Sequence, residues 1–402
     1  MNNDDILKYA LESGMLNLDT IQREIDMRRR KEILEKHPYK IWLGADGYWH
    51  THLPEKSDTG RKRAIKKKTQ QDIESVVIDY WEKENNNQFK KRFNIWVNRQ
   101  QALGRSDNTI YKYECDYKRF IAGDKIEEMD IKNITSEEIG FYLLRLLSRQ
   151  EVNYRALKGL FGYLNGVFEK AIIDDVIQKN PCNHVDLPMF KKKCTEVRKK
   201  TAQERTFSDS EKKVLLKKID TSTSMARFAV ELAIYTGMRV GELSALKWSD
   251  IDYKSSVINV VRSEKHNQKT GEYFIDTTKN DKHRQIPLTE SMKDVLKRTK
   301  VEELKHGYTT EFVFSNENGR VHASVISDYA RNHTMSNEFT NTKSVHALRR
   351  TLNSNMKCMG VSTTVAASIL GHTEKVNEEN YTYDISSLED KKKYIELAGK
   401  IS

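Results

Sequence analysis

The chain has 402 residues, which at roughly 100 to 200 residues per domain predicts between two and four domains. Lysine and arginine number 69 against 58 aspartate and glutamate, so the formal net charge is +11, as expected of a protein with an anionic partner. Hydrophobic residues make up 37% of the chain, and no apolar run approaches the ~18 residues that a transmembrane helix needs. This composition excludes an integral membrane protein, and we expect no membrane partner.

The N-terminal sequence and the cysteines predict a cytoplasmic protein. The first residues, MNNDDILKYALESG, are acidic and lack the apolar stretch of a secretory signal peptide. The four cysteines lie far apart without CxxC spacing, which favours free structural thiols over a disulfide framework or a zinc finger. They are Cys115, Cys182, Cys194 and Cys358.

The N-terminal part of the chain predicts a helix followed by a small sheet. Residues 1–37 carry apolar side chains near helical spacing, which predicts a helical N-terminal extension. In residues 38–85 the alternating segments YKIWLG and YWHTHL and a basic third segment precede the helical pattern TQQDIESVVIDYW. We expect a three-stranded sheet covered by one helix, because so small a sheet is not stable alone.

The remainder predicts a helical bundle, a linker and a mixed domain. Residues 86–190 keep helical spacing of their apolar side chains, which predicts an all-α bundle. The basic segment 191–207 is expected to be an extended linker, and 208–402 a mixed α/β domain with a C-terminal tail. In this last domain we predict strands VINVVR, EYFIDTT and HRQIPLT among helices. The predicted fold class is therefore multidomain, mainly α with α+β parts.

Two basic clusters are candidates for contact with DNA phosphates. One follows the aromatic strands of the sheet and the other lies in the expected linker. A charge run alone is more often a solvated surface, but two runs joined by a strap can wrap a duplex. The candidate DNA-binding residues are Arg61, Lys62, Arg63, Lys66, Lys67, Lys68, Lys191, Lys192, Lys193, Lys199 and Lys200. A metal site at His50 and His52 is the weaker alternative, because no cysteine or acidic ligand is near them in the pattern.

Three polar patterns in the last domain place cations where they can meet an oxyanion. Arg239 lies between a helix that ends at Gly237 and a helix that begins near Val240. Lys279 follows the strand EYFIDTT and could donate a proton. His346 and Arg349 share one helix face through their i, i+3 spacing. Each pattern alone is more commonly an ordinary surface feature.

Two further residues complete the set. His372 follows a helix that ends at Gly371, and Tyr381 comes nine residues later. A lone histidine at this position is commonly a cap and a tyrosine is commonly packing, but a tyrosine oxygen can attack phosphorus where cations stabilise the developing charge.

Taken in order, Arg239, Lys279, His346 with Arg349, His372 and Tyr381 resemble the signature of the tyrosine recombinase (phage-type integrase) family. The chain is most similar to integrases of conjugative transposons. The resemblance implies that residues 38–85 are an arm-type DNA-binding domain, 86–190 a core-binding domain and 208–402 the catalytic domain. Residues 1–37 lie outside the family pattern.

The resemblance implies a DNA strand transferase that integrates and excises a mobile element. Tyr381 would attack the scissile phosphate to form a 3′-phosphotyrosyl bond and release a 5′-hydroxyl, without metal, ATP or another cofactor. Arg239 and Arg349 would neutralise the non-bridging oxygens, and Lys279 would protonate the leaving oxygen. His346 and His372 would assist phosphate binding and proton transfer.

The implied partners are double-stranded DNA with core-type and arm-type sites, three further copies of the chain in a tetramer, and a small excision or directionality factor. The enzyme would be bacterial or phage-encoded and associated with the nucleoid. The tail, with Leu388, Tyr394, Ile395 and Leu397, would dock on a neighbouring subunit or fold back on its own domain. The N-terminal module disfavours a type IB topoisomerase or an Xer-type resolvase. The alternative from another class is a DNA-binding regulator with an inactive catalytic domain.

Overall fold

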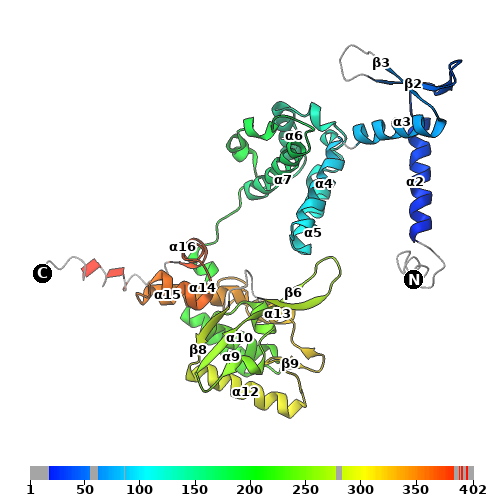
Figure 1. Cartoon of the computed structure of the whole chain (residues 1–402). Helices are drawn as coiled ribbons and strands as arrows, with labels where there is room; N and C mark the ends of the chain where they lie inside the picture. Colours follow the sequence, from blue (N-terminus) through cyan, green and yellow to red (C-terminus); the bar gives the residue numbers. More distant parts are fainter. Residues whose placement is uncertain are drawn as a thin grey trace. The chain divides into compact units, whose positions relative to one another are not determined.

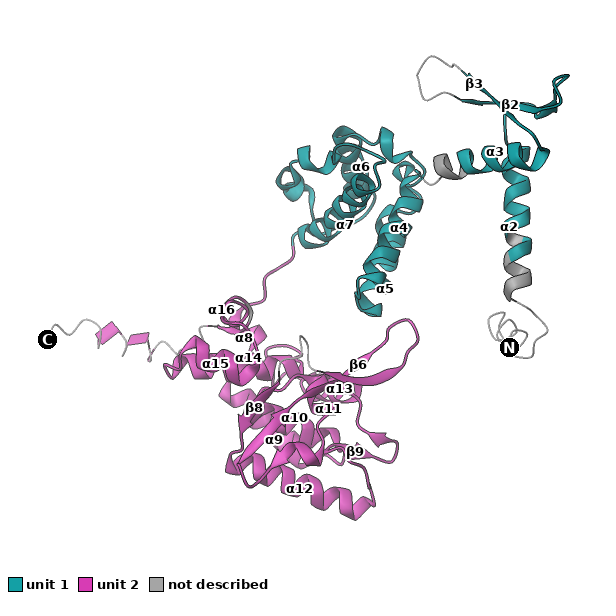
Figure 2. Cartoon of the chain, viewed as in Figure 1, with its two compact units in different colours: residues 1–196 teal, residues 197–402 magenta. Residues whose placement is uncertain are grey.

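The computed structural model describes residues 18–54, 62–85, 87–277, 283–383, 389, 391–392 and 395–396. The chain forms two compact units, residues 1–196 and 197–402, which Figure 2 shows in different colours. All four cysteines are free thiols, as predicted, and Cys182 and Cys194 are buried. Within the described ranges, no helix is both long and apolar enough to cross a bilayer.

The N-terminal part of the first unit is a sheet with helices (Figure 1). Strands β1 (Trp42–Leu43), β2 (Trp49–Pro54) and β3 (Lys62–Lys67) form an antiparallel sheet in that order. Along β2 the side chains alternate, so that Thr51 and Leu53 are buried and contribute to the core with helix α3 (Gln70–Asn85). Helix α2 (Leu18–Glu35) also packs on α3. The described part of the predicted N-terminal extension is therefore packed with the sheet and its helix.

A buried histidine joins α2 to this sheet and helix. His37 follows α2, and its Nδ1 accepts a hydrogen bond from Trp81 Nε1 at 3.0 Å. Its Nε2 lies 2.9 Å from Thr51 Oγ1, whose hydroxyl donates to the Lys40 carbonyl at 3.1 Å. Because Nδ1 accepts, Nε2 carries the proton of a neutral imidazole. Burial lowers the pKa of His37, so the structure stabilises the uncharged ring.

This arrangement predicts that acid weakens the N-terminal part of the chain. The folded-state pKa of His37 lies below its unfolded value of about 6.5, so its contribution is full above that pH and is lost as pH falls below it. We expect the urea midpoint followed by tryptophan fluorescence to decrease between about pH 7.5 and pH 5. In His37→Gln this decrease should be smaller, whereas His52→Gln should behave like the wild type. An equal pH dependence in His37→Gln and wild type would contradict this role.

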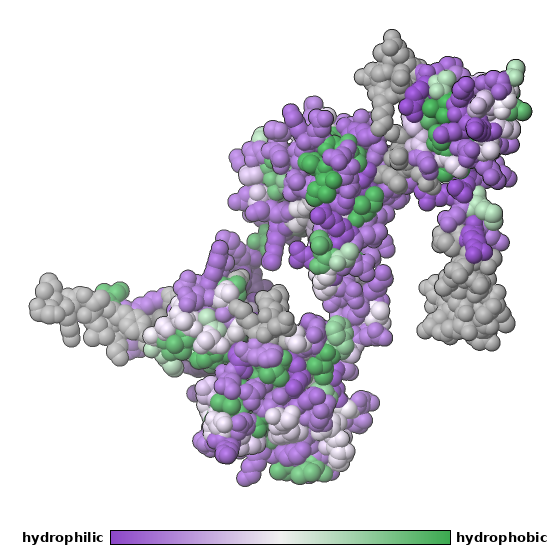
Figure 3. Space-filling view, in the orientation of Figure 1, coloured by the Kyte–Doolittle hydropathy of each residue, from purple (hydrophilic) through white to green (hydrophobic). Residues whose placement is uncertain are grey.

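The rest of the first unit is a helical bundle. Its main helices are α4 (Phe89–Ala102), α5 (Asp107–Asp116), α6 (Ser136–Arg149) and α7 (Tyr154–Ile173). Shorter helical segments are η1 (Tyr117–Ile121), η2 (Lys125–Glu127), η3 (Ile131–Asn133), η4 (Pro181–His184) and η5 (Leu187–Lys193). Side-chain caps begin α6 and α7: Thr135 accepts a hydrogen bond from the Glu138 amide, and Asn153 accepts one from the Ala156 amide. Phe141 and Leu144 remain exposed, and Figure 3 shows a hydrophobic area over α6 within a largely hydrophilic surface.

The segment 191–207 was predicted to be an extended basic linker; its residues 196–200 form no helix or strand and are exposed, whereas both of its ends are structured. Residues up to Lys193 form η5, and the Thr195 amide bonds to the Val152 carbonyl of the bundle at 3.0 Å. From Val197 the chain belongs to the second unit, where α8 (Ala202–Arg205) begins with a capping box at Thr201. Lys343 is fully buried there and donates to the Gln203 carbonyl at 2.6 Å and to Glu211 at 3.1 Å. Hydrogen bonds to the backbone and one buried ion pair thus hold the C-terminal end of this segment.

The second unit is built around one buried helix. Helix α10 (Ala226–Thr236) is apolar on most faces and packs against α9 (Asp209–Asp220), α12 (Glu290–His306), α13 (Ala323–His333) and α14 (Val345–Cys358). The remaining helices are α11 (Val240–Ser244), α15 (Thr363–Leu370), α16 (Glu374–Tyr381) and the short η6 (Trp248–Asp250). Figure 1 shows α14, α15 and α16 next to one another, in agreement with their contacts.

The strands of this unit form three small antiparallel sheets. They are β4 (Ile251–Asp252), β5 (Val257–Val260) and β8 (Arg284–Pro287) in the order β4-β5-β8, with β6 (Arg262–His266) on β7 (Tyr273–Thr277) and β9 (Ser315–Asn316) on β10 (Gly319–Arg320). The predicted strand VINVVR is therefore two strands that change partner at Val261. Ile258 and Val260 are buried in the core, whereas β6 is mostly half-buried and β7 mostly exposed, which explains the division.

Candidate active site

The junction between α10 and α11 fixes the first arginine. Gly237 ends α10 in the left-handed conformation, with φ of 59°. A Cβ at this position would lie 2.7 Å from Leu370 Cδ2, so only glycine fits without a shift. Two residues later Arg239 is the N-cap of α11 and remains 31% exposed. The chain therefore presents this guanidinium from a rigid helix junction.

Arg239 shares a buried carboxylate with a second arginine. Its Nη1 donates to Glu242 Oε1 at 2.7 Å, and its backbone amide donates to Oε2 at 2.9 Å. Arg284 donates to both oxygens of the same carboxylate, at 3.1 and 2.6 Å. Burial alone would raise the pKa of Glu242, but the hydrogen bonds and charge of Arg284, followed by the charges of Arg239 and Arg349, lower it to about 2. Glu242 is thus an anion within a cationic cluster.

Arg349 lies at the centre of the cluster and is fully buried. Its Nη1 donates to the Gly237 carbonyl at 2.6 Å, and its Nη2 donates to the Leu370 carbonyl and to His372 Nε2, the latter at 2.7 Å. It therefore binds the C-terminal ends of α10 and α15. Burial and, next, the charge of Arg239 lower the pKa of Arg349 to about 9.

Two histidines flank Tyr381. The His372 ring lies 3.9 Å from the Tyr381 ring, and the His346 ring lies 5.1 Å away, edge-on (centroid distances). Burial and, next, Arg349 lower the pKa of His372 to about 3, while burial and Arg350 lower that of His346 to about 4. Both imidazoles are therefore neutral at pH 7. Nδ1 of His372 is buried and has no hydrogen-bond partner among the described residues.

Tyr381 ends α16 with its ring 5.5 Å from the Arg349 guanidinium carbon. Its side chain is 8% exposed. The Tyr381 carbonyl accepts from Ser354 Oγ at 3.3 Å, and Asn353 on α14 donates to Thr382 Oγ1 at 3.2 Å. Asn377 donates to Asn353 Oδ1 at 2.7 Å. These buried polar groups hold the tyrosine of this chain beside its own arginines.

Tyr383, the neighbouring tyrosine, has a different environment. Its hydroxyl accepts a hydrogen bond from Arg205 Nη1 at 3.2 Å, and the Arg205 guanidinium carbon lies 5.7 Å from its ring. The Tyr381 ring thus lies against His346, His372 and Arg349, whereas the Tyr383 ring lies against Arg205. The cationic and histidine side chains of the cluster therefore lie around Tyr381, the tyrosine that the sequence pattern indicated.

The structure brings together Arg239, His346, Arg349, His372 and Tyr381, which the sequence analysis singled out. Lys279 lies outside the described residues. Glu242 and Arg284 were missed, because an acidic residue in a basic site and an arginine inside a strand gave no functional signal. Asn353, Ser354 and Asn377 were also missed, since polar residues on helices are usually solvated.

The candidate DNA-binding residues are surface residues where they are described. The basic residues on or next to β3 are exposed: Lys62, Arg63, Lys66, Lys67 and Lys68. The lysines Lys191, Lys192, Lys193, Lys199 and Lys200 are exposed as well. Arg61 lies outside the described residues. On the sheet face away from α3, Trp42 is 41% exposed and stacks on His50 and His52, both at 5.6 Å. Lys66 pairs with His50 across the strands, and its ammonium lies 4.9 Å from the Tyr48 ring. His50 itself bonds to Asp46 at 2.8 Å.

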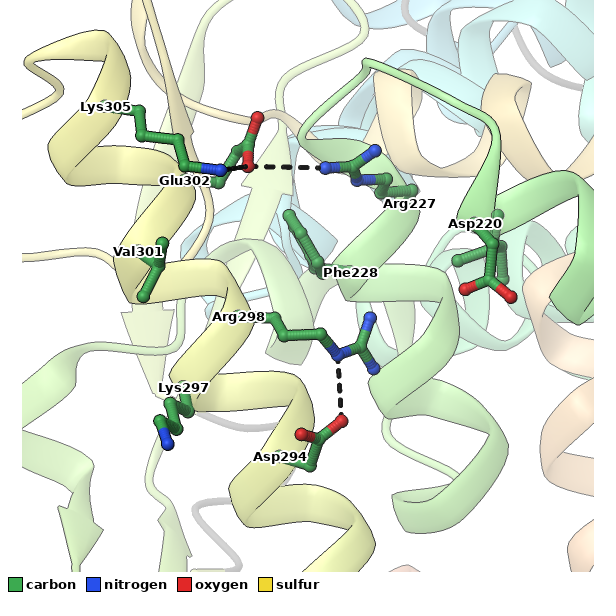
Figure 4. A pocket seen from close by; sticks show the side chains of 10 residues that line it. Asp220, Arg227, Phe228, Asp294, Lys297, Arg298, Val301, Glu302 and Lys305 are labelled. Carbon is green, nitrogen blue, oxygen red and sulfur yellow. Dashed lines mark hydrogen bonds and ion pairs between the residues drawn. The ribbon is translucent and has the colours of Figure 1, made fainter.

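A hollow of about 480 Å³ between α9, α10 and α12 does not belong to this site (Figure 4). Its charged side chains pair mainly with one another. Arg298 binds Glu231 at 2.5 Å and Asp294 at 2.8 Å, and Arg227 lies 3.7 Å from Glu302. The hollow contains none of the residues around Tyr381.

Comparison with known proteins agrees with this geometry. Residues 205–385, which contain all the residues of the candidate site, match the phage integrase family. The chain is 28% identical over 313 residues to a tyrosine recombinase XerC-like protein of Caldanaerobacter subterraneus subsp. tengcongensis, covering 72% of this chain and 78% of that protein. The chain is a tyrosine recombinase.

Two further likenesses concern recombinases of mobile elements. The chain is 25% identical to the transposase from transposon Tn916 of Enterococcus faecalis, over 72% of this chain and 73% of that protein. The Tn1549 transposon integrase, solved in complex with a circular intermediate DNA, has the same fold, with a TM-score of 0.61. The two sequences are 21% identical, and the match covers 76% of this recombinase and 99% of that chain. The predicted family and fold class are thereby confirmed.

Proposed function

We propose that this tyrosine recombinase integrates and excises a mobile element by cutting and rejoining DNA at specific sites. Tyr381 attacks the scissile phosphate, its oxygen forms a bond to phosphorus, and the 5′-oxygen leaves as a hydroxyl. The reverse attack by a 5′-hydroxyl restores the phosphodiester and the tyrosine. The observation that carries this proposal is the position of Tyr381 against Arg349 and between two neutral histidines.

The charges of the site suit this reaction. Arg239 and Arg349 face a phosphate that gains negative charge in the transition state, and guanidinium groups bind such oxygens through two donors. A neutral His346 can accept the tyrosine proton, and the unpartnered Nδ1 of His372 can donate to a phosphate oxygen. We assign to Lys279 the protonation of the leaving 5′-oxygen. The energy of the broken bond is retained in the phosphotyrosyl bond, so the scheme requires neither metal nor ATP.

The N-terminal unit is proposed to hold the DNA. The exposed face with Trp42, His50, His52 and Lys66 combines aromatic and cationic side chains, as DNA-contacting surfaces do. We assign arm-type sites to residues 38–85, with the packed α2 as their support, and core-type sites to the bundle at 86–190. The exposed lysines of the segment 191–200 would contact DNA phosphates.

Exchange of two duplexes requires four strand cleavages, so we propose a tetramer of this chain on DNA. Exposed apolar side chains of α6 offer surface that contact between subunits can bury. Of the tail residues expected to dock on a neighbour, Ile395 is 72% exposed, whereas Leu388, Tyr394 and Leu397 lie outside the described residues. We also propose that a small excision factor sets the direction of the reaction and that it takes place at the nucleoid in the cytoplasm.

A nicked suicide duplex tests the proposed chemistry. The duplex carries the junction of the element that encodes the chain, and the reaction contains EDTA and no ATP. We expect a covalent protein–DNA adduct on a denaturing gel, with none on a duplex of equal length and scrambled core. Tight, salt-sensitive binding without an adduct would instead support a DNA-binding regulator with an inactive catalytic domain.

A further inference from the structure

Arg284 is almost completely enclosed, as Arg349 is. It begins β8, and its side chain is 6% exposed. Both of its terminal nitrogens donate to Glu242, at 3.1 and 2.6 Å, and its Nε donates to the Ile369 carbonyl at 3.0 Å. Because all three nitrogens are engaged with protein, Arg284 is not placed to bind a phosphate itself. Its influence must act through the groups that it holds.

The first of these groups is the carboxylate that it shares with Arg239. Glu242 is 1% exposed and accepts from Arg239 Nη1 and from the Arg239 amide in addition to Arg284. A buried carboxylate needs compensation by a partner. With Arg284 present, one positive charge is committed to Glu242. Arg239 uses one N–H of Nη2 for the Gly371 carbonyl and keeps the other N–H and its exposed edge for another anion. Without Arg284, Arg239 would be the remaining ion-pair partner of Glu242.

The second group is the end of α15. Gly371 follows this helix in the left-handed conformation, and a Cβ there would lie 3.0 Å from Arg284 Cδ. The Gly371 carbonyl accepts from Arg239 Nη2 at 3.3 Å, and His372 is the next residue. Arg284 thus contacts the turn that carries His372. The same turn contacts Arg239.

We propose that Arg284 is a positioning residue of the recombination site, which holds Glu242 and the end of α15 so that Arg239 is available to the scissile phosphate. The inference rests on the proposed function of Tyr381 and Arg239. In this proposal Arg284, at the start of β8, supports catalysis through Glu242 and the end of α15 and does not bind the DNA itself.

Replacement of Arg284 tests this role through both rate and pH. In Arg284→Met the largest influence that lowers the pKa of Glu242 is gone, so burial raises this pKa. The ionised carboxylate then draws Arg239 away from the phosphate. We expect single-turnover cleavage at saturating suicide duplex to fall at least ~10-fold with little change in DNA binding. Cleavage by the variant should recover relative to wild type as pH is lowered, because protonation of Glu242 releases Arg239.

A second substitution separates positioning from general damage. Arg284→Met with Glu242→Gln should cleave faster than Arg284→Met alone, because the neutral amide no longer competes for Arg239. Arg298→Met is the matched control, since Arg298 pairs with buried Glu231 in the same unit and away from Tyr381. Arg284→Lys, with and without Glu242→Gln, provides the same comparison if Arg284→Met does not fold.

The outcomes distinguish this inference from the proposed function. Slow cleavage in the Arg284 variant that Glu242→Gln accelerates supports positioning. Positioning is overturned if Arg284→Met cleaves within about twofold of Arg298→Met. It is also overturned if Arg284→Met with Glu242→Gln cleaves more slowly than Arg284→Met alone. In both cases, formation of the adduct by wild type leaves the proposed function intact. Absence of an adduct with wild type overturns both.

Discussion

Tyr381→Phe is expected to abolish the covalent adduct with a suicide duplex while DNA binding stays within about twofold of wild type. The substitution removes one oxygen from a ring that is 8% exposed and packed between His346 and His372. The ring contacts and the buried hydrogen bonds of Ser354 and Asn353 to this segment remain. Loss of a nucleophile typically reduces rate by ~10⁴-fold or more, so no adduct should be visible after overnight reaction.

Tyr383→Phe is the matched control for this prediction. It removes a hydroxyl two residues away that accepts from Arg205 and lies outside the group of side chains around Tyr381. We expect Tyr383→Phe to form the adduct at a rate close to wild type. An adduct that persists in Tyr381→Phe and disappears in Tyr383→Phe would assign the nucleophile to Tyr383 and contradict our account.

Arg239→Lys is expected to reduce single-turnover cleavage by about 10²–10³-fold, equivalent to about 2.7–4 kcal/mol, as loss of an oxyanion donor does. Lysine keeps the charge but lacks the planar fork that lets Arg239 bind Glu242 and the Gly371 carbonyl while facing an anion. Affinity for the duplex should change little, because many phosphate contacts contribute to binding and this one matters most in the transition state.

The control for this prediction is Arg298→Lys, which alters an arginine of the same unit paired with Glu231 and Asp294. Rates and affinities are measured on the same suicide duplex by rapid mixing and by filter binding. A large loss of affinity in Arg239→Lys with cleavage of the bound DNA at the wild-type rate would show that Arg239 serves binding and not the transition state.

Local sequence signals predicted much of the second unit because the residues that cause the structure are close in the chain. Ser208 and Glu211 form the capping box at the start of α9. Gly237 and Gly371 both end helices in the left-handed conformation. Arg239 and His372, which follow these two turns, therefore lie close to the positions that the sequence predicted for them.

Partners far apart in the chain were not predictable in the same way. Glu242 and Arg284 are 42 residues apart, and their carboxylate and guanidinium meet only in the folded domain. Lys343 is buried on Glu211 and on the carbonyls before Phe207, although lysine is almost always a surface residue. For this reason the charge pattern did not show that Lys343 holds the C-terminal end of the segment 191–207.

The most direct test of the account is to locate the protein–DNA bond. The wild-type adduct on the suicide duplex is digested with trypsin and nuclease and analysed by mass spectrometry. Our account predicts a nucleotide 3′-phosphate linked to the Tyr381 side chain and a free 5′-hydroxyl on the released strand. A nucleotide attached to any other residue, or a phosphate retained on the 5′ end, would contradict it.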